Sequence, residues 1–375
     1  MTDSRVARLA DVLVAYSTRI KPGDRVIIEG QPSAEPLIRA LFERILKAGG
    51  HPHLALSLSG LETMTGLDDV FLTFANEDQL DYPATFYQHA YENFEARIRI
   101  HSLNNTRMLS SIPQDRKTRR KRATSPVLKA QFERGGRDEY KWLTTLFPTT
   151  AYAQDAEMSL ESFEDFVYRA CQVHDSASDP VAHWKQVQAE QQRLVELMQG
   201  HDLVVLKGPN VDLQLSIKDR IFLNACGLSN MPDGEIFTGP VENSLRGWVH
   251  FTYPTSLAGN AVEGVELRFE EGQVAEARAS RNEAFLKEMI ATDPGASYVG
   301  EFAFGLNAGI QRNIRNILFD EKIGGSFHLA LGAGYPETGS VNKSAIHWDL
   351  ICDMKTDSEV FLDGELVYQN GVFCV

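Results

Sequence analysis

The chain has 375 residues, of which 43% are hydrophobic and 23% are charged, with 28 Gly and 15 Pro. This balance is that of an ordinary globular protein and excludes a disordered, collagen-like or coiled-coil chain. Asp and Glu total 51 against 37 Lys and Arg, so the net charge of -14 disfavours general binding to nucleic acid. At roughly 100–200 residues per domain, this length favours two domains.

The apolar runs, such as residues 203–206, are far shorter than the roughly 18 residues that a membrane span needs. The N-terminus is helix-like and lacks the long apolar core of a secretory signal, so we expect a cytoplasmic protein with no membrane partner. No Cys-x-x-Cys pair occurs, which argues against a disulfide framework and a thiolate zinc site. The widely spaced cysteines are Cys171, Cys226, Cys352 and Cys374.

The first elements in chain order alternate between helix and strand. Apolar residues at helical spacing predict a helix over residues 5–16, and residues 26–28 form a short buried strand. Ser33 is positioned to cap a helix over 35–47, and the next strand covers 53–58. A strand, a helix and a strand within about 35 residues predict a βαβ unit in a parallel sheet.

Helices and an isolated strand at 96–101 continue the pattern to about residue 174. One basic cluster, residues 116–122, lies in this region. Its six cations suggest a solvated helix face, and contact with an anionic ligand or partner is the alternative. One such cluster in a net-acidic chain does not indicate a nucleic-acid-binding protein.

A long polar helix is predicted from residue 181 to 199, ending at Gly200. Short alternating strands follow, over residues 203–207, 211–217, 246–253 and 262–269. We therefore predict α/β plus α+β architecture: an N-terminal βαβ-type domain over residues 1–200 and a strand-rich, metal-binding catalytic domain over residues 201–375.

The apolar segment around residues 345–352 contains two residues that suggest chemistry. Side chains alternate in a strand, so His347 and Asp349 point to the same face. A carboxylate on an apolar strand costs several kcal/mol unless it is paired or binds a metal. Both side chains can reach one metal cluster, although a buried hydrogen bond between His347 and Asp349 is an equal alternative.

Three further residues lie in or beside apolar strands. Taken alone, His328 is best interpreted as a core histidine and Glu235 as a hairpin glutamate. Glu301 is a carboxylate in an apolar run, and such a residue is rarely buried without a partner. Together with His347 and Asp349 they form the ligand set of a dinuclear Zn, Co or Mn site. Such a site acidifies water into a nucleophile.

Residues 230–238, Asn-Met-Pro-Asp-Gly-Glu-Ile-Phe-Thr, resemble the signature of the M29 family of metallo-aminopeptidases, the aminopeptidase T group. Residues 300–302, 328–332 and 347–349 are similar to later motifs of the family in the same order, and 208–213 is also similar. The resemblance covers about residues 200–355 and is thin over the N-terminal half.

The resemblance implies that the metal ligands are Glu235, Glu301, His328, His347 and Asp349, with Glu301 also acting as a base. It also implies an active-site tyrosine seven residues after the first histidine, which matches Tyr335. Its hydroxyl is suited to hydrogen-bonding the oxyanion. Family members are dimers of two-domain subunits, so we expect a homodimer.

Two departures from the family pattern concern the surroundings of the site. The stretch from His328 to His347 is short, at 19 positions, which affects the expected substrate entrance. Some members carry an extra glutamate before the first histidine; Glu321 is the candidate here, with a turn glutamate as the alternative.

These observations predict an aminopeptidase that hydrolyses N-terminal peptide bonds with two divalent cations. The alternatives are an Fe(II) ring-cleaving dioxygenase of dihydroxypyridines, using His328, His347 and Asp349, and an amidase for small amides. A binding protein without metals is a third possibility. Gly332 and Gly334 lack the third glycine and the following helix of a nucleotide-binding loop, so no organic cofactor is expected.

Overall fold

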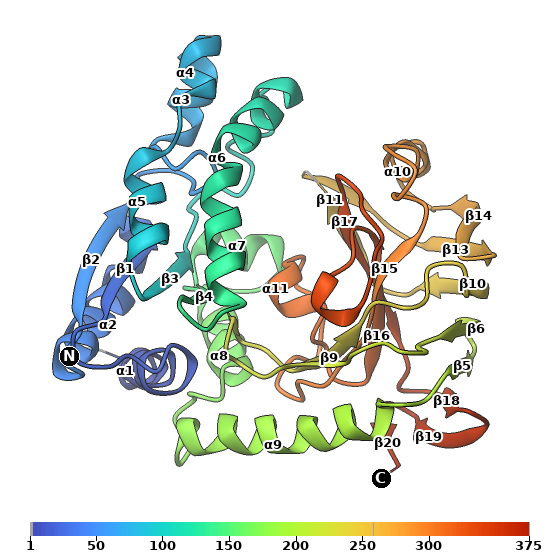
Figure 1. Ribbon diagram of the computed structural model, residues 1–375. Coiled ribbons are helices and arrows are strands. Elements are labelled where there is room, and N and C mark those ends of the chain that lie inside the picture. Colours follow the sequence, from blue (N-terminus) through green and yellow to red (C-terminus); the bar gives the residue numbers. More distant parts are fainter. Residues whose placement is uncertain (1–2, 258, 375) are drawn as a thin grey trace. The chain divides into compact units, whose positions relative to one another are not determined.

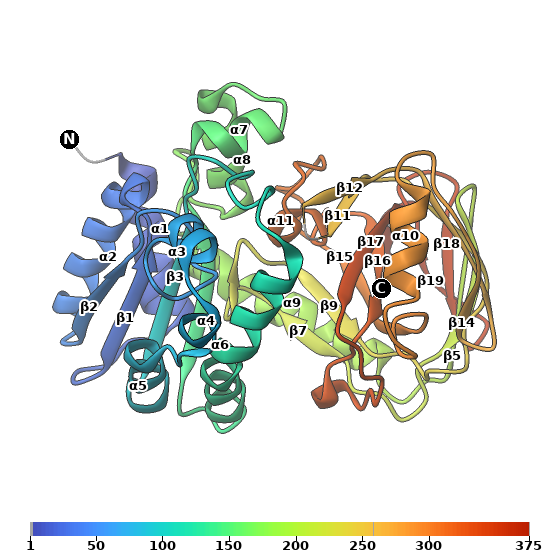
Figure 2. The same cartoon turned by 90° about the horizontal axis from the view of Figure 1, so that it is seen from above.

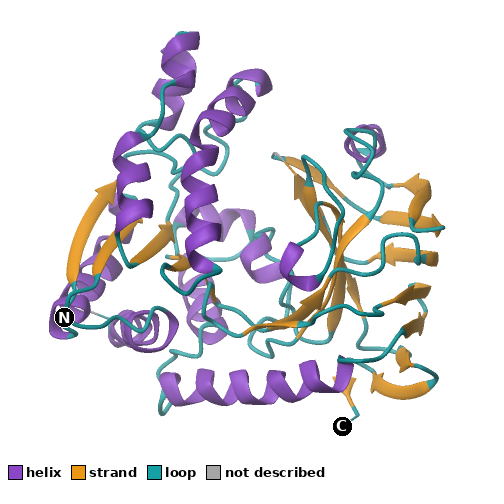
Figure 3. Cartoon of the chain, in the orientation of Figure 1, coloured by secondary structure: helices purple, strands orange, loops and turns teal. Residues whose placement is uncertain are grey.

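The computed structural model describes residues 3–257 and 259–374 (Figure 1). The chain divides into two compact units, with Met1–Lys185 and Gly227–Pro232 in unit 1, and Gln186–Cys226 and Asp233–Val375 in unit 2. The division falls inside the long helix α9 (Pro180–Met198). The domain boundary near residue 200 remains a prediction. Most helices belong to unit 1 and most strands to unit 2 (Figure 3).

Unit 1 contains the parallel sheet that the sequence predicts. Its strand order is β2-β1-β3-β4-β8, and every neighbouring pair is parallel. The strands are β1 (Arg25–Gly30), β2 (His51–Leu56), β3 (Ala96–His101), β4 (Lys141–Leu146) and β8 (Asn230–Met231). The helices are α1 (Ser4–Asp11), α2 (Glu35–Lys47), α3 (Asp68–Phe74), α4 (Glu77–Asp81), α5 (Thr85–Asn93), α6 (Gln114–Gly135), α7 (Thr150–Asp155) and α8 (Leu160–Ala170).

Two details at the start of unit 1 differ from the predictions. The first helix changes at Val12 into a π-helix that runs to Ser17. Ser33 does not cap α2, because it lies in a 3-10 turn and its hydroxyl donates to the carbonyl of Ser102. Instead, α2 begins with a proline in its first turn, where a missing N–H costs nothing.

The basic cluster on α6 has a structural role that the sequence did not reveal. Arg116 donates to carbonyls at the C-terminal end of α3, and Arg120 to those at the end of α4. Arg119 forms ion pairs with Asp81 and Glu77. The last carbonyls of a helix lack intrahelical partners, so these cations satisfy two helix ends. The interpretation as a merely solvated face is wrong for Arg116 and Arg120.

Unit 2 is built from two antiparallel sheets and a two-stranded ribbon, whose layers Figure 2 shows from above. The first sheet has the order β14-β13-β10-β6-β5-β18-β19-β20, with β5 (Leu203–Gly208), β6 (Val211–Ser216), β10 (Arg246–Phe251), β13 (Val265–Glu270), β14 (Gln273–Arg278), β18 (Glu359–Leu362), β19 (Glu365–Gln369) and β20 (Val372–Phe373). The second has the order β17-β16-β15-β9-β7, with β7 (Leu223–Ala225), β9 (Glu235–Thr238), β15 (Val299–Gly305), β16 (Ser326–Gly332) and β17 (His347–Asp353).

The remaining elements of unit 2 are short. The ribbon is formed by β11 (Thr255–Leu257) and β12 (Asn260–Val262), and the helices are α10 (Glu283–Ile290), α11 (Ile317–Asp320) and a 3-10 turn at Pro336–Thr338. None of the helices in the described part of the chain has the length and hydropathy needed to cross a bilayer.

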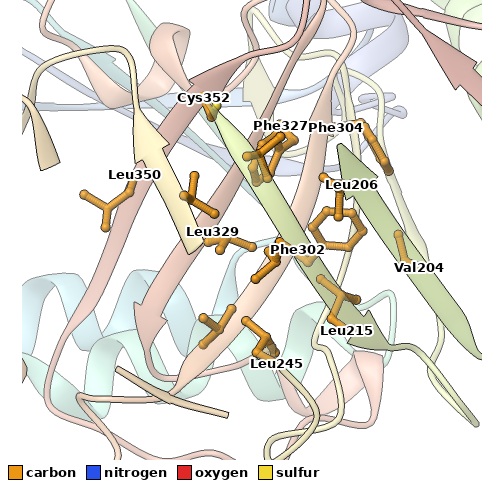
Figure 4. Packing of buried hydrophobic residues seen from close by; sticks show 14 of the residues in the cluster. Val204, Leu206, Leu215, Leu245, Phe302, Phe304, Phe327, Leu329, Leu350 and Cys352 are labelled. Atoms are coloured by element: carbon orange, nitrogen blue, oxygen red, sulfur yellow. The ribbon is translucent and has the colours of Figure 1, made fainter. Parts of the chain in front are cut away.

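One apolar cluster joins the two sheets of unit 2 (Figure 4). Val204, Leu206 and Leu215 come from the eight-stranded sheet, and Phe302 and Leu329 from the five-stranded sheet. Because side chains alternate along a strand, the residues between these apolar positions point to the other face of the five-stranded sheet. That second face carries the five predicted metal ligands.

Candidate metal centre

The five predicted ligands lie on β9, β15, β16 and β17, which are adjacent in the five-stranded sheet. Ala330 of β16 pairs with Glu301 on one side and Asp349 on the other. His347 pairs with Gly332, two residues along the same face, and Glu235 pairs with Gly305 on β15. The register therefore brings side chains from four strands to one patch of the sheet.

The donor atoms form two overlapping groups. One consists of Glu235, Glu301 and His328, and the other of Glu301, His347 and Asp349; within each group the atoms lie within 4.8 Å of one another. Glu301 Oε1 is 3.6 Å from His328 Nε2, and its Oε2 is 3.2 Å from His347 Nε2. The two oxygens of one carboxylate thus face the two histidines.

The donor set fits divalent cations. Glu235 Oε2 and Asp349 Oδ1 are buried without a hydrogen-bond partner, and each such atom costs about 1–3 kcal/mol unless something compensates it. Nδ1 of His347 is 2.8 Å from the carbonyl oxygen of Ala333 and donates there, so Nε2 is the ring nitrogen that faces the carboxylates. Imidazole and carboxylate ligands without thiolates suit a divalent transition-metal ion.

The charges of the centre are strongly coupled when no cation is present. Burial opposes protonation of the imidazoles, yet the neighbouring carboxylates raise the pKa of His328 to about 9 and that of His347 to about 12. Burial also opposes ionisation of Asp349, but His347 lowers its pKa to about 2. Burial likewise opposes ionisation of Glu301, but the two neighbouring histidines lower its pKa. Because metal ligands must be deprotonated, protons and a divalent cation compete for these side chains.

Lys322 is a buried cation that the sequence analysis missed. Its side chain is 0% exposed, and its Nζ lies 3.6 Å from Glu235 Oε1 and 4.0 Å from Asp233 Oδ1, besides pairing with Glu321. Burial alone would lower the pKa of Lys322, but these carboxylates raise it above its usual 10.5, so the amine stays charged. A charged triplet at residues 320–322 reads as a surface turn, so nothing in the local sequence signals this burial.

Glu321, the candidate extra ligand, belongs to neither donor group within the described residues. Its carboxylate pairs with Lys322 instead, and its side chain is 17% exposed. Glu321 therefore lies next to the donor groups, and Lys322 forms ion pairs with both Glu321 and Glu235. Glu321 lies in a turn, and burial together with its acidic neighbours raises its pKa, so its role as an extra site residue remains a prediction.

Tyr335 lies beside the centre in the segment that joins β16 to β17. Its ring centroid is 5.4 Å from that of His347 and 5.4 Å from that of Phe237. The residue is 38% exposed, so it is open to a ligand from solvent. Packing around the ring and the nearby carboxylates raise the pKa of Tyr335 well above 10, so its hydroxyl remains a hydrogen-bond donor.

The family model and the similar proteins of known name point to the same family. The family described as thermophilic metalloprotease (M29) matches residues 2–373. Aminopeptidase 2 of Geobacillus stearothermophilus is 24% identical, covering 98% of this chain and 97% of its own. Aminopeptidase T of Thermus thermophilus is also 24% identical, over 97% and 95% of the two chains.

Two solved structures share the fold. Wild-type AmpT from Thermus thermophilus superposes with a TM-score of 0.84 at 22% identity, covering 99% of both chains. A 2,5-dihydroxypyridine dioxygenase from Pseudomonas putida KT2440 has a TM-score of 0.60 at 14% identity, covering 99% of this chain and 97% of its own. Since the family match extends over nearly the whole sequence, the chain belongs to the M29 family of thermophilic metalloproteases and is a metal-dependent hydrolase.

Proposed function

We propose that this metal-dependent aminopeptidase holds two divalent cations, one at Glu235, Glu301 and His328 and the other at Glu301, His347 and Asp349. The observation that carries the proposal is the shared carboxylate: Glu301 directs one oxygen toward each histidine. A mononuclear centre does not need this arrangement. The ligand type favours Zn, Co or Mn over a hard, all-oxygen ion such as Mg.

When bound, divalent cations acidify water and polarise the scissile carbonyl of a peptide. Glu301 accepts the proton that the attacking water loses and delivers it to the leaving amine. Tyr335 donates its hydroxyl hydrogen to the oxyanion that develops on the carbonyl oxygen. The free α-amino group of the substrate would bind one of the cations or pair with a nearby carboxylate, and either contact would restrict cleavage to the first peptide bond.

The test combines metal analysis with a substrate screen. We expect two Zn, Co or Mn ions per chain by mass spectrometry and the release of N-terminal residues from peptides and aminoacyl amides. One iron per chain, with oxygen uptake on a dihydroxypyridine, would replace the proposal with ring cleavage. Hydrolysis of small non-peptide amides alone would replace it with an amidase.

We also propose that the enzyme is a homodimer, on the strength of the family resemblance, and that it is cytoplasmic, as the sequence leads us to expect. Light scattering after size-exclusion chromatography tests the assembly: a homodimer of the 41.9 kDa chain would give a measured molar mass twice that of the chain. A monomer at micromolar concentration contradicts it. Cell fractionation tests the location.

A further inference from the structure

Lys322 is a buried cation beside the proposed metal centre and is not one of the proposed metal ligands. Lysine is almost never fully buried unless it is paired. Here the side chain is 0% exposed, and its three ion-pair partners are Asp233, Glu235 and Glu321. Among these, Glu235 is also a proposed metal ligand.

Glu235 divides its two oxygens between two cationic neighbours. Its Oε1 lies 3.6 Å from Lys322 Nζ, and its Oε2 lies 3.7 Å from His328 Nε2. Within the described residues, the ion pairs of Lys322 include neither Glu301 nor Asp349. The ammonium therefore contacts one donor group through its own carboxylate and does not contact the other.

The backbone around Lys322 fixes this position. Lys322 donates its N–H to the carbonyl of Phe319 at 3.0 Å, and its own carbonyl accepts from the N–H of Asn307 at 3.1 Å. Gly305, the register partner of Glu235, has no side chain; a Cβ there would lie 3.0 Å from the carbonyl carbon of Lys322. The close approach of the Lys322 segment to β15 depends on that glycine.

We propose that Lys322 is a positioning residue that orients Glu235 and makes the two cation positions unequal, the weaker being the one at Glu235, Glu301 and His328. This inference rests on the proposed metal centre. The ammonium group of Lys322 offsets part of the negative charge of Glu235 and repels a divalent cation bound beside that carboxylate. The position at Glu301, His347 and Asp349 keeps two carboxylates without an ammonium in contact. We expect its affinity to be at least about tenfold higher.

The test is a metal titration of the apo-protein by calorimetry, with a chromophoric chelator as competitor, on the wild type and on Lys322→Met. Methionine keeps the length of the side chain and removes the charge. The wild type should bind Zn in two steps of unequal affinity. The variant should tighten the weaker step at least tenfold, while its metal-free melting temperature falls because Glu235 and Glu321 lose their counter-ion.

Lys355→Met is the matched control, because Lys355 is a half-buried lysine of the same unit that pairs with Asp353 at 2.8 Å, away from the donor groups. Its two binding steps should equal those of the wild type. If Lys322→Met fails to fold, Lys322→Gln removes the same charge while keeping a polar group that can hydrogen-bond Glu235, and it gives the same comparison.

The outcomes separate this inference from the proposed function. Two equal steps in the wild type, or a weaker step that Lys322→Met leaves unchanged or loosens, overturn the role of Lys322 while leaving the dinuclear centre intact. A wild type that binds fewer than two divalent cations overturns the centre itself. A purely structural lysine would lower the melting temperature without changing the affinity of either step.

Discussion

Replacement of Glu301 by glutamine tests the residue on which both donor groups depend. The substitution exchanges one carboxylate oxygen for an amide nitrogen in nearly the same volume. It removes the charge that faces His328 at 3.6 Å and His347 at 3.2 Å, and it removes the proposed base. The core on the other face of β15, including Phe302, is not touched.

The expected loss of activity follows from the loss of proton transfer. General acid–base catalysis contributes about 10²–10⁴ in rate, which corresponds to about 3–5 kcal/mol of transition-state stabilisation. Weaker metal binding adds to this loss, so kcat/KM for an aminoacyl amide should fall by about 10³ or more. Circular dichroism should remain that of the wild type, because the amide retains an oxygen that accepts a hydrogen bond.

Initial rates and metal content are measured on the same samples, with Glu276→Gln as the control. Glu276 is an exposed carboxylate on β14, and its neutralisation should change neither quantity. Loss of activity with both metals retained assigns Glu301 as the base. Loss of activity together with loss of the metals assigns Glu301 as a ligand. Wild-type kcat/KM with wild-type metal content refutes both roles.

Three further perturbations test other parts of the reasoning. Tyr335→Phe should lower kcat by about 10² with little change in KM, because only an oxyanion donor is lost; equal kcat values in steady-state assays would exclude that role. Arg99→Met should lower the free energy of unfolding by about 3–5 kcal/mol in urea, since it leaves the wholly buried Glu29 without the guanidinium that binds it at 2.6 Å. Burial and two arginines lower the pKa of His101 to about 4, so the unfolded chain takes up a proton between pH 6.5 and 4 that the folded chain does not. The free energy of unfolding should therefore fall by up to about 3 kcal/mol as the pH falls over that interval. In His101→Gln this pH dependence of the free energy of unfolding should flatten.

Most of the two sheet types, and the meeting of the five proposed ligands on one sheet face, could be predicted from the sequence. Alternation of polar and apolar residues places His347 and Asp349 on one strand face, and the structure confirms that they share it. The parallel sheet of unit 1 is likewise confirmed. Tyr335 had no local signal of its own and was found through family resemblance.

Features that depend on contacts between distant segments were not predictable. The burial of Lys322 depends on Glu235 and Asp233, which lie far away in sequence. The carbonyl contacts of Arg116 and Arg120 depend on how α3 and α4 pack against α6. In each case the local composition is charged and favours a solvent-exposed interpretation.

The strict alternation along β15, β16 and β17 links correct strand pairing to ion capture. Each donor stands next to a core residue: Glu301 beside Phe302, and Asp349 beside Leu350. A slip of one residue in pairing would turn every donor inward and every core side chain outward. A misaligned sheet thus loses its apolar interior and its capacity to chelate at once. The proposed metal centre can therefore form only in molecules in which β9, β15, β16 and β17 are all paired in register.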